Sequence, residues 1–106
     1  MKITLFDSIE KAKEVIPEGE LRVVRIENKK ILLANHGGKF YAFEKNCPHM
    51  GHPLEDGRIN PYGEIVCALH TYRFDLATGS ESSKRCRDLE LFPVFEENEK
   101  LVVDFS

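Results

Sequence analysis

The chain lacks the features that would place a protein in a membrane, outside the cell or on nucleic acid. No apolar run in its 106 residues approaches the roughly 18 that a membrane helix needs. The opening residues turn polar at Asp7, so we expect no secretory signal and a cytoplasmic location. The formal net charge of −3 argues against nucleic-acid binding, which usually needs a basic face.

Cysteines are few, and their number is odd. Three cysteines in a chain of this length do not form a disulfide framework, which agrees with a reducing compartment. The sequence also has no internal repeat, no low-complexity run, no linker and no nucleotide-binding loop. Its length is enough for one small core, so we expect a single domain over residues 1–106.

Short apolar segments separated by turn residues predict an all-β fold. We expect early strands at 3–6, 21–27, 31–35 and 39–44, with a hairpin turn at Gly37-Gly38. Ser8 is placed to cap a short helix. We expect a later strand from Leu89 to Phe95, disturbed by Pro93, and a last strand at 101–105. Roughly eight to ten short strands with little helix indicate a sandwich or a barrel.

Two short segments carry a metal-ligand pattern. The first reads Cys47-Pro48-His49, and after seventeen residues the second reads Cys67-Ala68-Leu69-His70. Each segment offers one thiolate and one imidazole, the donors that a soft metal centre prefers. We therefore predict that two loops close around a metal centre through Cys47, His49, Cys67 and His70.

The pattern resembles the Rieske family of iron–sulfur proteins, and in particular its small bacterial ferredoxins. Residues around the four ligands share the resemblance: Gly51 and Leu54 after the first pair, and Phe74-Asp75 and Thr78-Gly79 after the second. The resemblance implies one 2Fe–2S cluster, with Cys47 and Cys67 on one iron and His49 and His70 on the other. It also implies a β-sandwich base with an inserted cluster-binding subdomain at about residues 45–75.

Several positions differ from the high-potential branch of that family. The resemblance implies that this branch carries disulfide-forming cysteines where His52 and Leu69 stand here. It also implies a serine and a tyrosine at the positions of Tyr72 and Phe74, whose hydroxyls donate hydrogen bonds to sulfur. We therefore expect a low reduction potential and read His52 as a loop residue. In addition, Thr71 replaces a glycine that is common after the second histidine.

Other residues near the loops have less specific interpretations. Cys86 is expected to be a free structural thiol, whose flanking arginines would lower its pKa if it were exposed. His36, beside Gly37-Gly38, is expected to be a turn residue. Five charged residues near the loops either shape partner docking or are ordinary solvated side chains: Lys45, Glu55, Asp56, Arg58 and Arg73.

The resemblance implies a one-electron carrier and not an enzyme. It would take electrons from a reductase and pass them to an oxygenase, with the partner docking at the His49/His70 edge and the carrier a monomer. The alternative is a small subunit of an oxidoreductase such as nitrite reductase. A more remote alternative, from the donor set alone, is a structural zinc module with Cys₂His₂ ligation.

Overall fold

The described chain is built mostly from short β-strands. The structure is a computed structural model, and it describes residues 1–69 and 71–105. The elements are β1 (Lys2–Phe6), α1 (Ile9–Val15), β2 (Leu21–Ile26), β3 (Lys29–His36), β4 (Lys39–Glu44), the 3₁₀-helix η1 (Leu54–Asp56), β5 (Arg58–Ile59), β6 (Glu64–Val66), β7 (Arg73–Asp75), β8 (Leu91–Phe92), β9 (Val94–Glu97) and β10 (Lys100–Asp104). Neither α1 nor η1 has the length and apolar character to cross a bilayer.

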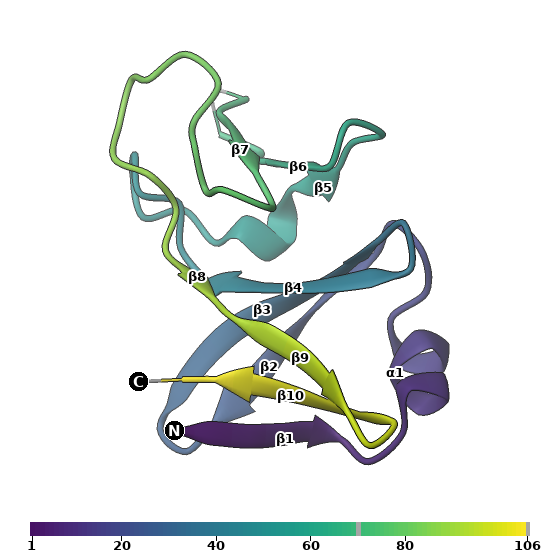
Figure 1. The fold of residues 1–106 in the computed structure, drawn as a ribbon. Helices are drawn as coiled ribbons and strands as arrows, with labels where there is room; N and C mark the ends of the chain where they lie inside the picture. Colours follow the sequence, from purple (N-terminus) through teal and green to yellow (C-terminus); the bar gives the residue numbers. More distant parts are fainter. Residues whose placement is uncertain (70, 106) are drawn as a thin grey trace.

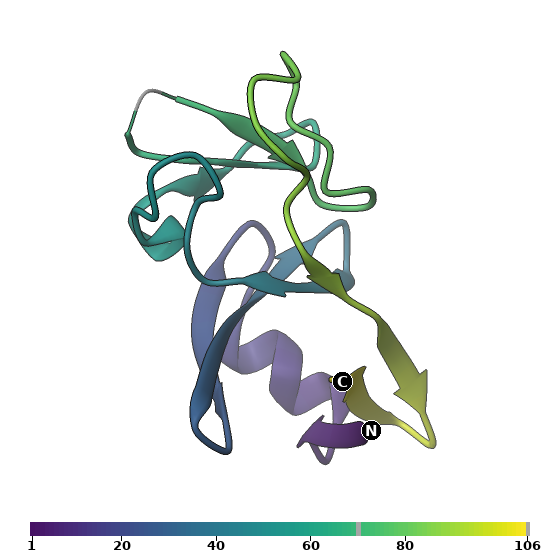
Figure 2. The same ribbon diagram turned by 90° about the vertical axis from the view of Figure 1, so that its left-hand side faces the viewer.

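The strands form three antiparallel sheets, and the predicted all-β class is confirmed. The sheet β1-β10-β9 lies at the end that holds both termini, and β2-β3-β4-β8 lies in the middle (Figure 1). The small sheet β5-β6-β7 lies at the opposite end, together with the loops around it (Figure 2). Within the described residues no sheet closes into a barrel, so the sandwich is the form observed.

The central strand β3 is buried on both faces. Leu32 and Ala34 pack into the core on the side of β5-β6-β7, whereas Ile31 and Leu33 pack into the core beneath α1. This alternation follows from the two-residue period of a strand. Ser8 caps α1 by accepting a hydrogen bond from the Lys11 N–H, as predicted. The β2-β3-β4-β8 sheet therefore separates two apolar cores, and the small sheet packs on one of its faces.

Pro93 divides the predicted strand from Leu89 to Phe95 into two. β8 pairs with β4, whereas β9 pairs with β10 in a different sheet. Proline has no N–H to donate, so it interrupts a ladder, but its carbonyl still accepts the Asp104 N–H at 2.8 Å. The residue marks the point where the chain leaves one sheet for another. His36 also differs from expectation, because it is the last residue of β3 and pairs with Lys39 across the hairpin.

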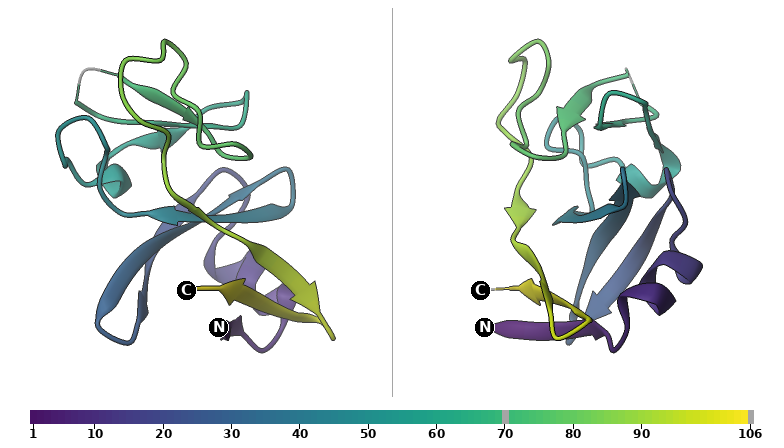
Figure 3. Two further views of the ribbon diagram at one scale, coloured as in Figure 1. Left: turned by 60° about the vertical axis from the view of Figure 1, so that its left-hand side comes forward. Right: turned by 45° about the vertical axis from the view of Figure 1, so that its right-hand side comes forward.

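The loop over residues 76–90 connects the small sheet to β8 (Figure 3). A buried carboxylate, that of Glu81, holds this loop in place. Glu81 is fully buried and accepts hydrogen bonds from the backbone N–H groups of Ser83 and Arg85. The Arg85 guanidinium also donates to Glu81 at 3.0 Å. These hydrogen bonds lower the pKa of Glu81 from 4.5 to about 2, and the bond from the Arg85 guanidinium has the largest effect.

The same loop is closed at its base by Gly79. Its φ is +79°, and a Cβ there would lie 2.3 Å from the Leu89 carbonyl oxygen. The Leu89 N–H donates to the Gly79 carbonyl at 2.7 Å, so the two backbones touch. Only glycine fits both the left-handed conformation and the contact.

We expect Gly79→Ala to destabilise the protein more than Gly38→Ala does. Gly38 has the same φ of +79°, but nothing lies within 4 Å of a Cβ there. The left-handed conformation alone costs roughly 1–2 kcal/mol, and Gly79→Ala adds the clash with Leu89. Urea unfolding followed by circular dichroism gives both values. Equal losses of unfolding free energy would contradict the contact with Leu89.

We expect Glu81→Gln to lower the free energy of unfolding by about 2 kcal/mol at neutral pH, because Arg85 loses its ionic partner. Folding lowers the Glu81 pKa from 4.5 to about 2, so its contribution is complete above about pH 4.5 and declines as the pH falls toward 2. The gap in unfolding free energy between wild type and variant should therefore narrow as the pH falls from about 4.5 toward 2. Glu96→Gln, at an exposed position of β9, is the control and should show no such narrowing. A constant gap would contradict the low pKa.

Candidate metal centre

The first predicted ligand loop lies between β4 and η1 and is closed by backbone hydrogen bonds. The Cys47 N–H donates to the His52 carbonyl at 2.8 Å, and the Gly51 N–H donates to the Cys47 carbonyl at 2.7 Å. Asn46 and Pro53 form an isolated bridge at the base of the loop. This closure turns Cys47 inward, where it is buried.

The second predicted ligand loop joins β6 to β7. The Cys67 N–H donates to the Tyr72 carbonyl at 2.8 Å, and Cys67 is buried. Thr71 has a φ of 53°, in the left-handed region, which explains why a glycine is expected at this position. His70, the fourth predicted ligand, lies outside the described residues.

The two loops bring Cys47 and Cys67 together in one apolar core. Both thiols are free, and they share this core with Leu54 and Phe74. Burial raises the pKa of the Cys67 thiol, and the neighbouring Cys47 raises it further, against a backbone hydrogen bond from Leu69 that lowers it. A thiol buried in an apolar core gives up its proton readily only when a cation compensates the charge. The pair therefore fits a thiolate-bound metal.

His49 is less buried than the two cysteines. Its ring is partly exposed and stacks on Tyr72, with ring centroids 4.0 Å apart and an angle of 14° between the planes. Its Nδ1 atom is buried. The family resemblance implies that this nitrogen would bind iron, and its burial is compatible with that expectation.

The grouping of the described side chains bears on the kind of metal centre. Among residues 1–69 and 71–105, no three cysteine, histidine or acidic side chains gather around one point. A Cys₂His₂ zinc site would bring Cys47, His49 and Cys67 to a single ion, with sulfur at about 2.3 Å. A 2Fe–2S cluster with two ligands on each iron requires no such group of three. The described residues are therefore compatible with the iron–sulfur cluster.

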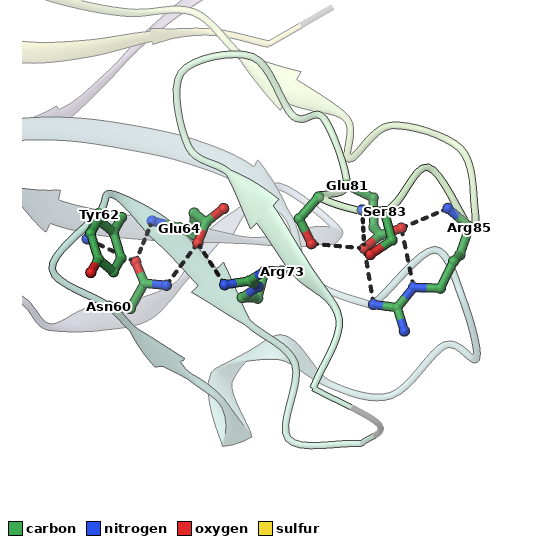
Figure 4. Close-up of polar contacts among 8 residues, drawn as sticks. Asn60, Tyr62, Glu64, Arg73, Glu81, Ser83 and Arg85 are labelled. Carbon is green, nitrogen blue, oxygen red and sulfur yellow. Dashed lines mark hydrogen bonds and ion pairs between the residues drawn. The ribbon is translucent and has the colours of Figure 1, made fainter.

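His49 packs against a set of stacked side chains that the sequence did not indicate. The Arg85 guanidinium lies 3.6 Å from the centre of the Tyr72 ring, on which His49 also stacks. Arg85 is held in turn by the buried Glu81 (Figure 4). Cation–π contact and aromatic stacking both favour this arrangement. The sequence marked Arg85 only as a neighbour of Cys86 and gave no signal for Glu81, which lies in a polar segment typical of a loop.

His52 and Cys86 do not join the proposed ligands. The His52 Nε2 lies 3.2 Å from an Asp56 carboxylate oxygen, which agrees with its interpretation as a loop residue. Cys86 is half-buried, and burial raises the pKa of its thiol more than Arg85 and Arg87 lower it. The flanking arginines therefore do not make it a thiolate.

Comparisons with known proteins agree with this geometry. A family model described as the Rieske [2Fe-2S] domain matches residues 8–93. The chain is 33% identical to the ferredoxin component of the naphthalene 1,2-dioxygenase system of Pseudomonas aeruginosa, over 86% of this chain and 88% of that protein.

Solved structures share the fold. One is a chain in the complex of reduced oxygenase and oxidized ferredoxin in carbazole 1,9a-dioxygenase, with a TM-score of 0.78, 24% identity, and coverage of 96% of this chain and 91% of that one. Another is a putative NADH-dependent nitrite reductase small subunit from Mycobacterium tuberculosis, with a TM-score of 0.79, 14% identity, and coverage of 97% and 93%. With the family match over most of its length, the chain belongs to the Rieske family and is an electron-transfer protein that carries one 2Fe–2S cluster.

Proposed function

We propose that Cys47 and Cys67 bind one iron of the cluster and that His49 and His70 bind the other. The observation that carries the assignment is the pair of buried thiols, brought together from two loops and followed on the first loop by a partly exposed imidazole. When bound, such a cluster supplies reversible one-electron chemistry. The protein's own residues exclude water from the thiol side and bring the His49 ring to the surface.

The acceptor that we propose is an oxygenase, and the donor is a reductase. The naphthalene system ferredoxin component supports this assignment because the chain is similar to it over nearly the full length of both proteins. The partner would dock where His49 reaches the surface, in an open groove shared with Thr71 and Arg85. A small, transient interface suits a carrier that must release its partner after each electron.

The remaining assignments follow from the same role. We propose that residues 1–106 form one Rieske domain, with the cluster-binding part at about 45–75, and that it acts as a monomer without catalysing a reaction alone. Three cysteines, of which two serve as thiolate ligands, suit the reducing cytoplasm.

A small subunit of nitrite reductase is the second candidate. The structural likeness to the Mycobacterium tuberculosis protein favours it, but at 14% identity that likeness shows the fold alone. The two functions differ in the protein that oxidises the reduced carrier. Rapid re-oxidation by an oxygenase component supports the first function, whereas stable co-purification with a nitrite reductase large subunit supports the second.

We expect Cys47→Ser and Cys67→Ser each to abolish the cluster, lowering the iron content from about two per chain to near zero. Cys86→Ser is the matched control and should keep both iron and visible absorption, because Cys86 lies outside the ligand pattern. Metal analysis with electron paramagnetic resonance checks all three variants. One zinc per chain and no iron in the wild type would contradict the assignment.

We expect a midpoint potential near the lower end of the Rieske range, about −150 mV, and not near +300 mV. Phe74 is fully buried in the core that contains both cysteines and has no hydroxyl to donate to a sulfur. Phe74→Tyr should therefore raise the potential, whereas Phe95→Tyr, on an exposed part of β9, should not. Protein-film voltammetry measures all three proteins. A wild-type midpoint well above zero would show that the missing hydroxyl and cysteines do not determine the potential.

A further inference from the structure

An open groove beside His49 is lined by three arginines, Arg58, Arg73 and Arg85, which we call the arginine surface. The groove has a volume of about 500 Å³, and none of the described residues that line it carries a carboxylate. The shallower groove that contains His49 shares Thr71 and Arg85 with it. The arginine surface is therefore continuous with the edge at which His49 is exposed.

In two ion pairs of this region the arginine is more exposed than its carboxylate partner. Arg73 lies 3.9 Å from Glu64, and their side chains are 50% and 19% exposed. Arg85 lies 3.0 Å from Glu81, and their side chains are 41% and 0% exposed. Figure 4 shows both carboxylates beside their arginines, with Glu64 also bound by the Asn60 amide. In each pair the carboxylate is therefore the more buried partner, and the arginine side chain stays partly exposed to solvent.

Ion pairs at the other end of the molecule lack this asymmetry. Lys2 and Glu97 are 53% and 43% exposed, so a partner approaching there would meet both charges. Arg58, by contrast, has no ion pair within the part of the chain that the structure describes. The arginine surface is therefore a local region of positive potential on a chain whose net charge is −3.

Exposed apolar side chains lie along the same region. Tyr62 lines the arginine groove and is among the most exposed large hydrophobic residues, and Met50 follows His49 in the first loop. Tyrosine, methionine and arginine are enriched where proteins bind one another. The composition fits a protein partner better than it fits a small ion.

We propose that the arginine surface receives an acidic face of the redox partner protein. The proposal rests on the proposed function and adds the sign of the partner's charge. At physiological salt the Debye length is about 8 Å, so charges beside the contact outweigh the distant net charge. Complementary charge at the contact speeds association and orients the partner, which brings its redox centre toward His49.

The test uses small oxidants of known charge on the dithionite-reduced, cluster-loaded protein. Each hexacyanoferrate(III) trianion, or each tris(1,10-phenanthroline)cobalt(III) trication, takes one electron from the protein in a stopped-flow experiment. Salt is varied from about 0.01 M to about 1 M, which shortens the Debye length from about 30 Å to about 3 Å. We expect the rate to fall with salt for the anion and to rise for the cation. A molecule that responded through its overall negative charge would give the opposite signs.

Matched variants distinguish the effect of the arginine surface on the rate from the effect of the net charge. The double variant Arg58→Gln/Arg73→Gln should slow the anionic oxidant about three- to tenfold at low salt and reverse its salt dependence. Arg22→Gln/Arg25→Gln changes the net charge equally on exposed positions of β2 and should leave the wild-type salt dependence in place. Equal effects of the two double variants, or a wild-type rate that rises with salt for the anion, would overturn the proposal.

A second measurement does not depend on electron transfer. Calorimetric titration of the protein as purified with the redox-inert hexacyanocobaltate(III) anion should show binding to wild type that the Arg58→Gln/Arg73→Gln variant loses. Protein that contains no iron refutes the proposed function alone, whereas absence of anion binding refutes the arginine surface alone. Tight binding of a single-stranded RNA oligonucleotide, or dimerisation that depends on Arg58 and Arg73, would give the surface a different occupant and overturn the proposal.

Discussion

Two backbone hydrogen bonds hold the proposed ligands in place, and the rest of the site depends on them. The Cys47 N–H binds the His52 carbonyl, and the Cys67 N–H binds the Tyr72 carbonyl, so each loop folds back on its own cysteine. Both thiols then lie in an apolar core, and burial raises the pKa of the Cys67 thiol. Metal binding must therefore supply the free energy of deprotonation, which couples the ordering of these loops to the cluster.

The same closure separates an inner side of the site from an outer side. Sulfur lies inside among apolar residues, and the His49 ring lies outward against Tyr72. An electron carrier needs an inner and an outer side, because a buried centre is protected from water and an exposed edge allows a partner protein to approach closely. Arg85 extends the arrangement, since it stacks on Tyr72 while Glu81 fixes it to the loop after β7. One loop without regular structure thus supports the ligand and contributes charge to the surface around it.

The fold by itself does not select the function. A ferredoxin bound to an oxygenase and a nitrite reductase small subunit give nearly equal TM-scores, 0.78 and 0.79, to this chain. An electron carrier is distinguished by the chemistry of the site residues that the β-sandwich holds. In the proposed site the buried thiols and the partly exposed imidazole would carry that chemistry, and the arginine surface is a property of this chain's own side chains.

The sequence by itself determined the features that depend on neighbouring residues. Hairpin turns, the Ser8 cap and the Cys-x-His and Cys-x-x-His spacings are local, so they could be read directly and led to the all-β class and the family. The tertiary structure alone decided the features that join distant segments. It separated β8 from β9 at Pro93, placed the short strand β7 beside β6, and buried Glu81 under Arg85. A three-residue strand or a single buried acid carries no periodicity. Its position depends on packing against residues far along the chain, which local patterns do not encode.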